Sequence, residues 1–300
     1  MRGRPLTLIL AAALASGMAA VAHAQNAVPI WPSDRGAPGS EARRGEAEVV
    51  ENSYVHNVHN PSLTVFRADA AHANGVGVIV VPGGGHRMLV WLNEGVAPAR
   101  TLNRFGVTAF VLKYRLSREP GSPYDITRDA AADARRAVRW VRAHAKDYGV
   151  DPARIGLMGF SAGGELVSLV ADNPPAAPET PRDAVDRISA RPDFQVLVYP
   201  GPLGIPARGV AGAPPAFLAA GSADACCAPP TIALYQQLRA AGVSAELHLF
   251  ADTDHGFNVA MHSERVSVQH WPDRLADWLS DGGWLLPGPR HPTPSSWPTP

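Results

Sequence analysis

The stretch from Arg154 to Leu166 constrains the fold of this chain more than any other. A short apolar run ends at Gly159, and a helix-compatible segment begins just after Ser161, so the serine falls at a sharp corner between a strand and a helix. A side chain at Gly159 or Gly163 would crowd the neighbouring strand or helix around a residue held in an unfavourable backbone region. The pattern predicts a strained turn that exposes a serine nucleophile; the alternative is an ordinary turn between a strand and a helix.

Length and charge limit the classes of protein to be considered. The chain has 300 residues, with 27 acidic and 27 basic side chains and a formal net charge of zero, which favours one sizeable globular domain. No clustered Lys/Arg face is evident, so nucleic acid and anionic membrane surfaces are not expected partners. A small neutral or weakly charged substrate fits this balance better. The sequence does not indicate an oligomeric state.

The first 24 residues have the pattern of an export signal. Arg2 and Arg4 precede an apolar run from Leu6 to Val21, and Ala22-His23-Ala24 gives a small-residue cleavage site before Gln25. We therefore predict a signal peptide at residues 1–24 and an exported protein, periplasmic or secreted, without a stable membrane anchor. A retained anchor is the alternative.

The remaining chain is divided by composition. Residues 25–48 are rich in Pro, Gly and charge and are predicted to be a surface-running leader, residues 49–286 the domain, and residues 287–300 a disordered Pro/Ser/Thr-rich tail. Residues 173–191 are expected to form an insertion or cap over the carboxyl edge of the sheet.

Strand and helix patterns alternate through the domain. The expected strands cover residues 49–58, 62–67, 75–81, 107–114, 194–199, 216–220 and 245–250, the first two as an antiparallel pair, and a further strand is the apolar run that ends at Gly159. The expected helices cover residues 94–105, 129–148, 230–241 and 271–279, and a further helix begins just after Ser161. This alternation predicts an α/β fold with an open, mostly parallel sheet and helices on both faces.

A serine hydroxyl needs a base and an acid to act as a nucleophile, and the chain supplies both after expected strands. Asp224 lies in the loop after the strand at 216–220, and His255 lies in the loop after the strand at 245–250. Both loops fall on the edge where ligands bind in open α/β sheets. We expect Ser161, Asp224 and His255 to form a catalytic triad.

Several residues compete for these roles. Asp224 alone would also fit a helix cap, and Asp252 and Asp254 are rival acids that precede the histidine closely enough to brace its loop. The rival bases are His86, His248, His262 and His270. None of them lies directly after the last expected strand, as His255 does.

The run Gly83-Gly84-Gly85 follows a buried strand and predicts an oxyanion hole. Acyl transfer develops a negative oxygen that backbone N–H groups stabilise, and glycines let such amides approach closely. The amides of Gly84 and Gly85 would act together with that of Ala162. A flexible loop or a phosphate cradle is the alternative, but the expected Gly-Lys-Ser/Thr ending is missing.

The two cysteines, Cys226 and Cys227, are neighbours and cannot form a long-range disulfide framework. A strained ring, intermolecular pairing and two free thiols stay open. Neither a His-x-x-x-His nor a Cys-x-x-Cys pair occurs, so we expect no metal and no cofactor.

Together, the Gly159–Gly164 turn, Pro82-Gly83-Gly84-Gly85-His86, Gly-Ser-Ala-Asp224 and Asp254-His255-Gly256-Phe257 resemble the α/β-hydrolase superfamily. More narrowly, the chain from about residue 63 to residue 285 resembles secreted bacterial esterases related to acetylxylan esterases and dienelactone-hydrolase-like proteins. The resemblance implies the triad and oxyanion hole given above, and carbohydrate acetyl esters as the substrate class. Glu165 and His86 depart from it, since such relatives often have His and Tyr at these positions.

The leading hypothesis is an exported serine esterase that removes small acyl groups, acetyl first, from a small-molecule or oligosaccharide ester. A xylan-acting glycosidase would need paired carboxylates, for which Glu94 and Glu165 are the nearest candidates. Two further hypotheses are a peptidase that uses the same triad and a catalytically inactive binding protein with the same fold.

Overall fold

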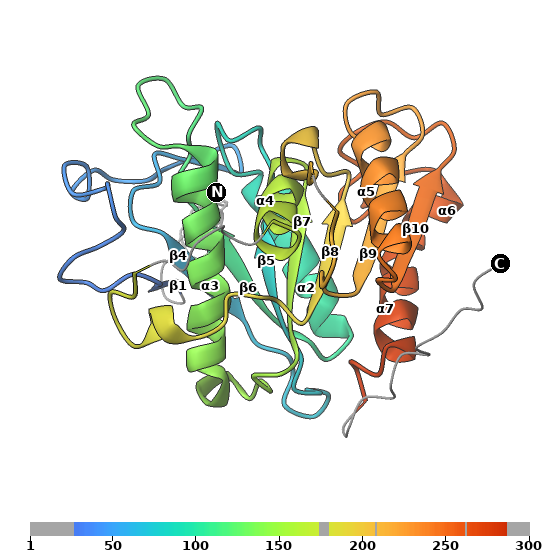
Figure 1. Ribbon diagram of the computed structural model, residues 1–300, viewed down its shortest axis with the longest axis horizontal. Helices are drawn as coiled ribbons and strands as arrows, with labels where there is room; N and C mark the ends of the chain where they lie inside the picture. The colour runs from blue at the N-terminus through green and yellow to red at the C-terminus, as the bar shows by residue number, and fades with distance from the viewer. Residues whose placement is uncertain (1–26, 174–179, 208, 262, 287–300) are drawn as a thin grey trace, which may run out of the picture.

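The computed structural model describes residues 27–173, 180–207, 209–261 and 263–286. An eight-stranded sheet forms the centre of this part of the chain, in the order β1-β4-β6-β5-β7-β8-β9-β10 (Figure 1). Its strands are β1 (Ala27–Pro29), β4 (Ser62–Phe66), β5 (Gly77–Val81), β6 (Thr108–Lys113), β7 (Ile155–Phe160), β8 (Phe194–Val198), β9 (Ala216–Gly221) and β10 (Ala245–Phe250). The β1–β4 and β4–β6 pairs are antiparallel, and the other five are parallel.

Helices cover both faces of the sheet. The α-helices are α2 (Ala97–Arg104), α3 (Ala131–Ala143), α4 (Ala162–Ala171), α5 (Ala228–Ala240), α6 (Val266–Gln269) and α7 (Trp271–Asp281). Two π-helical stretches, η1 (Trp91–Val96) and η2 (Ile126–Ala130), lead into α2 and α3. Short 3-10 turns occur at η3 (Ala145–Tyr148), η4 (Val185–Arg187) and η5 (Pro202–Gly204). In Figure 1, α3, α4 and α5 lie in front of the sheet, and α2 and α7 lie behind it.

The apolar runs explain the central strands. Every residue of β5, β7, β8 and β9 is buried, as expected for parallel strands covered on both faces. The predicted open, mostly parallel sheet is therefore confirmed, and the loops after β5, β7, β9 and β10 gather at its carboxyl edge. No helix in the described ranges has the length and apolar character needed to cross a membrane.

The opening of the domain differs from the prediction in two ways. Residues 49–58 do not pair with residues 62–66: β2 (Val49–Glu51) and β3 (Tyr54–His56) form their own hairpin. Asn52 and Ser53 both have positive φ, 46° and 73°, and thus make the tight two-residue turn that closes it. The expected surface leader also joins the fold, because β1 adds an edge strand beside β4, and Ile30 and Trp31 are buried.

Residues 180–191 do not cap the carboxyl edge of the sheet. Arg136 of α3 forms ion pairs with Asp183 and Asp186 at 2.6 and 2.7 Å. Arg142, near the end of α3, donates to the carbonyl of Ser189 at 2.6 Å. Arginine side chains of α3 therefore hold this segment against that helix. The predicted signal peptide and the predicted tail lie outside the described residues.

Candidate active site

Ser161 occupies a strained turn between β7 and α4. Its φ and ψ are 50° and −119°, a conformation that residues with side chains rarely adopt. A Cβ on Gly159 would lie 2.3 Å from the carbonyl oxygen of Gly163, and one on Gly163 would lie 2.0 Å from that of Val81. Glycine is therefore required at both positions, because the turn packs directly on its own helix and on β5.

The structure brings the three predicted side chains into one hydrogen-bonded chain. His255 Nε2 lies 2.9 Å from Ser161 Oγ, and His255 Nδ1 lies 2.6 Å from Asp224 Oδ2. Asp224 is 2% exposed, whereas the His255 side chain is 38% exposed. A buried carboxylate beside Nδ1 favours the tautomer in which Nδ1 carries the proton and Nε2 is free to accept one from the serine.

Asp224 also organises its own loop. Its Oδ1 accepts the backbone N–H groups of Cys226 and Cys227, both at 3.1 Å, just before α5 begins. A Cβ on Gly221 would lie 2.1 Å from the carbonyl oxygen of Thr253, so the loops after β9 and β10 are in close contact. One oxygen of Asp224 thus caps the turn before α5, and the other oxygen contacts His255.

The rival acids and bases have different partners. Asp254 accepts the backbone N–H of His255 at 2.7 Å and so braces the loop, while Asp252 is exposed. The remaining described rivals pair elsewhere: His248 with Glu246, His270 with Asp273, and His86 with Glu165. His262 lies outside the described residues. Of the histidines discussed, the described part of the chain places His255 alone against Ser161.

The glycine loop after β5 packs against the serine. A Cβ on Gly83 would meet the carbonyl oxygen of Phe160 at 2.6 Å and the Cβ of Ser161 at 2.9 Å. Gly84 and Gly85 have φ values of +123° and +63°. Ala162 is the first residue of α4, so its N–H has no partner within the helix. The loop and the helix N-terminus therefore meet beside Ser161.

The two glutamates considered for glycoside cleavage are buried and already engaged. Glu94 is 4% exposed and accepts the N–H of Gly83 at 2.8 Å and the hydroxyl of Tyr199 at 3.0 Å. Burial raises the pKa of Glu94, while these two hydrogen bonds act in the opposite direction. Glu165 lies 2.8 Å from His86 Nε2 and accepts the N–H of Leu203.

Sequence reasoning missed Tyr199. It directly follows β8 with a φ of 39°, and its ring centroid lies 4.6 Å from that of His255. A polar aromatic residue at the last position of the expected strand 194–199, on the same edge as the other site residues, was the available signal.

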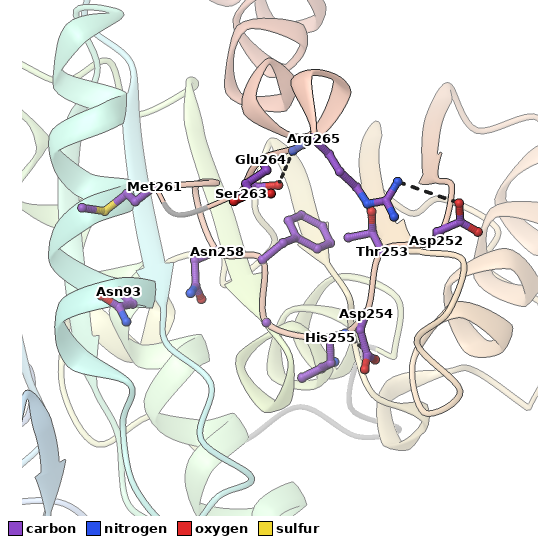
Figure 2. A pocket seen from close by; sticks show the side chains of 12 residues that line it. Asn93, Asp252, Thr253, Asp254, His255, Asn258, Met261, Ser263, Glu264 and Arg265 are labelled. Carbon is purple, nitrogen blue, oxygen red and sulfur yellow. Dashed lines mark hydrogen bonds and ion pairs between the residues drawn. The ribbon is translucent and has the colours of Figure 1, made fainter.

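A cavity of about 590 Å³ opens beside His255. It is lined mainly by residues 252–258, 261 and 263–265, with Asn93 on the opposite wall (Figure 2). Three of its lining residues are acidic (Asp252, Asp254 and Glu264), and one is basic, Arg265. Phe257 and Met261 add apolar surface. The cavity therefore suits a polar group that also presents an apolar face.

One further cluster has the composition of a metal site. The ligand atoms of Asp224, Cys226 and Cys227 lie within 4.8 Å of one another, and both thiols are free. Both oxygens of Asp224 are already engaged by the histidine and by the two cysteine amides. Burial also raises the pKa of the Cys227 thiol, which keeps it protonated. The donor set does not fit a resident metal, and the expectation of a metal-free site stays a prediction.

Residues 63–178 match the family model described as BD-FAE. The chain is 34% identical over 127 residues to an acetylxylan esterase from Xylanibacter ruminicola, which covers 42% of this chain and 23% of that protein. It is 33% identical over 123 residues to endo-1,4-beta-xylanase B from Butyrivibrio fibrisolvens, and this match covers 41% of this chain and 19% of that protein. The match thus spans less than a quarter of the length of either relative.

Two solved structures resemble the whole domain. An acetyl ester-xyloside bifunctional hydrolase from Caldicellulosiruptor lactoaceticus superposes with a TM-score of 0.73 at 28% identity, covering 86% of this chain and 97% of that one. Esterase 2 from Thermogutta terrifontis, phosphoramylated by tabun, gives a TM-score of 0.65 at 26% identity. This match covers 82% of this chain and 98% of that one. With the sheet order and the turn at Ser161, these likenesses show that the chain has the α/β-hydrolase fold and that esterases are among its structural relatives.

Proposed function

We propose that this chain is a serine carboxylic-ester hydrolase that removes small acyl groups, acetyl first, from carbohydrate esters. The observation that carries the proposal is the continuous contact from Asp224 through His255 to Ser161, with separations of 2.6 and 2.9 Å. Similarity to an acetylxylan esterase and to an acetyl ester-xyloside hydrolase supports the substrate class. The predicted signal peptide supports export.

In the first half-reaction, Ser161 Oγ attacks the ester carbonyl carbon while His255 Nε2 takes the hydroxyl proton. The imidazolium that forms is stabilised by the Asp224 carboxylate. The negative oxygen of the tetrahedral intermediate accepts hydrogen bonds from the amides of Ala162, Gly84 and Gly85, the proposed oxyanion hole. His255 then returns the proton to the departing alcohol, which leaves an acyl group on Ser161.

In the second half-reaction, water attacks the acyl carbon as His255 removes its proton, and collapse of the intermediate releases the acid and restores Ser161. Because the leaving alcohol receives its proton from His255, that alcohol must lie on the histidine side of the serine. The cavity that His255 helps to line is the proposed place for this alcohol. Its mixed lining supports a sugar as the leaving group: Asp254 and Asn258 can meet hydroxyl groups, and Phe257 and Met261 can meet the apolar face of the ring.

The test compares wild type with Ser161→Ala on acetylated xylan, on acetylated simple sugars and on 4-nitrophenyl acetate. We expect acetate release by wild type and a loss of at least about 10³-fold in the variant. A fluorophosphonate probe should label wild type at Ser161 and leave the variant unlabelled. Equal turnover by the two proteins would refute the proposal.

Cleavage of the xylan chain itself has less support. Glu94 and Glu165 are each buried and hydrogen-bonded to neighbouring groups, so they are poorly placed to flank a glycosidic bond. Release of reducing sugar from unacetylated xylan by pure protein would favour this activity.

A further inference from the structure

A buried chain of hydrogen bonds joins the glycine loop to the histidine loop. The N–H of Gly83 donates to Glu94 Oε2 at 2.8 Å, and the hydroxyl of Tyr199 donates to Glu94 Oε1 at 3.0 Å. The N–H of Asn258 donates to the same hydroxyl at 3.2 Å. The single hydroxyl proton has two acceptors in reach, Glu94 Oε1 at 3.0 Å and Asn258 Oδ1 at 3.1 Å, and with either one the hydroxyl oxygen can still accept the Asn258 N–H. Gly83 and Asn258, 175 residues apart in the sequence, are thus linked through two side chains.

The link is enclosed in the protein. Glu94 is 4% exposed and Tyr199 is fully buried. Burial raises the pKa of the Tyr199 hydroxyl, and the charge of Glu94 raises it further, so the phenol keeps its proton as a donor. A buried carboxylate is costly unless hydrogen bonds compensate, and here Gly83 and Tyr199 supply one bond to each oxygen. Moving the glycine loop would remove the partner of Glu94 Oε2, and moving the histidine loop would remove the Asn258 N–H from the Tyr199 hydroxyl.

Local backbone geometry supports the same conclusion. Glu94 lies in the π-helical stretch η1, an irregularity that occurs frequently at functional sites. Tyr199 and Asn258 have positive φ values of 39° and 50°. Such conformations cost about 1–3 kcal/mol each and persist where the surroundings fix them. All three residues are therefore held in unusual geometry at one end of the sheet.

We propose that Glu94 and Tyr199 are positioning residues that keep the amide donors of the glycine loop and the imidazole of His255 in a fixed relation. Tyr199 contributes twice, since its hydroxyl ties down the loop at Asn258 and its ring packs against His255, with centroids 4.6 Å apart. Neither residue exchanges a proton with substrate. The inference rests on the proposed esterase activity, because the two loops it joins are those that stabilise the oxyanion and carry the base.

The experiment measures kcat and KM with 4-nitrophenyl acetate for Glu94→Ala, Tyr199→Phe and the double variant. A displacement of catalytic groups by about 1 Å can cost about 100-fold, so we expect each single variant to lose about 10- to 100-fold in kcat while KM changes by less than about threefold. Because both residues serve one link, the double variant should lose no more than about threefold beyond the worse single variant.

Two controls separate positioning from general damage. Tyr124→Phe removes another buried tyrosine hydroxyl bond, the 2.7 Å contact to His59, and should leave kcat within about twofold of wild type. Glu94→Gln can accept the Gly83 N–H through its amide oxygen and donate to the Tyr199 oxygen through its amide nitrogen. It should therefore retain most of the activity that Glu94→Ala loses.

The outcomes distinguish this inference from the proposed function. If wild type is an active, Ser161-dependent esterase and Tyr199→Phe matches it in kcat, the inference fails alone. Multiplicative losses in the double variant would also refute it. If wild type hydrolyses no ester, the proposed function fails, but amide hydrogen exchange still tests the link between the two loops. Both single variants should speed exchange at residues 83–85 and 256–260 together. Unchanged exchange at these residues would overturn the inference.

Discussion

Replacing Asp224 by Asn tests the proposed mechanism most directly. The amide oxygen can still accept the N–H groups of Cys226 and Cys227, which are 3.1 Å from Oδ1. The amide nitrogen would then face His255 Nδ1, now 2.6 Å from Oδ2, and would favour the tautomer with its proton on Nε2. In that tautomer the imidazole cannot accept the Ser161 proton. The fold should survive while the base is disabled.

The magnitude follows from burial and contact. Breaking a buried charged pair costs about 3–5 kcal/mol, or about 10² to 10⁴ in rate at about 1.4 kcal/mol per factor of ten. The His255 side chain is 38% exposed, so solvent screens part of this charge. We therefore expect kcat for 4-nitrophenyl acetate to fall by about 10³ in Asp224→Asn. The free energy of unfolding should fall by less than about 2 kcal/mol, since the loop hydrogen bonds remain.

Asp69→Asn is the matched control. Asp69 is an exposed loop aspartate whose Oδ1 accepts the N–H of Ala71, two residues ahead, as Asp224 does with Cys226. Its variant should keep wild-type kcat. A loss below about tenfold in Asp224→Asn, with both proteins folded by circular dichroism, would refute the assigned role. A larger loss in Asp254→Asn than in Asp224→Asn would transfer the role to Asp254.

Three further perturbations give measurable outcomes. Gly163→Ala should lower the free energy of unfolding by more than about 3 kcal/mol in a urea titration, because its Cβ would lie 2.0 Å from the Val81 carbonyl oxygen. As the control, Gly45→Ala should leave the urea midpoint unchanged, because no atom lies within 4 Å of its added Cβ. Burial raises the pKa of Asp172 to about 6, so its stability contribution is greatest below its unfolded pKa and is lost as pH rises through 6. Asp172→Asn should accordingly stabilise the protein at pH 8, by at most about 3 kcal/mol, and by much less at pH 4, as thermal melts can check. Acidic residues outnumber basic ones in the cavity, so removing the charge of Glu264 should favour a substrate whose alcohol part is anionic. Glu264→Gln should raise kcat/KM for such an acetyl ester about two- to fivefold relative to that for a neutral ester. The difference should disappear in about 1 M salt.

Local sequence patterns predicted the parts of the site that depend on local geometry. The turn at Ser161 is set by glycines two residues away on either side, and the central strands are continuous apolar runs, so both can be read from short windows. Asp224 and His255 were found because each follows a strand at the same edge of the sheet. Their contact with Ser161 follows once the strand order is known.

The parts that the sequence did not predict depend on distant partners. β1 has three residues, and only its pairing with β4 makes it a strand. Residues 180–191 have the composition of a cap, but ion pairs with Arg136 of α3 hold them against that helix. Glu94 and Tyr199 are 105 residues apart, and no window of sequence contains both. In each case a tertiary contact, rather than local propensity, decided the outcome.

The first described residues determine how far this domain can be shortened from its N-terminal side. The carbonyl of Ile30 accepts from Arg136 at 2.7 Å, and the indole N–H of Trp31 donates to Asp133 at 2.8 Å. The carbonyl of Pro38 accepts from the buried guanidinium of Arg115. A truncation to residue 49 would remove all three partners and uncover the edge of β4, although Asp133, Arg136 and Arg115 would each keep other partners. A shortened domain that keeps these contacts therefore has to include residues 27–38.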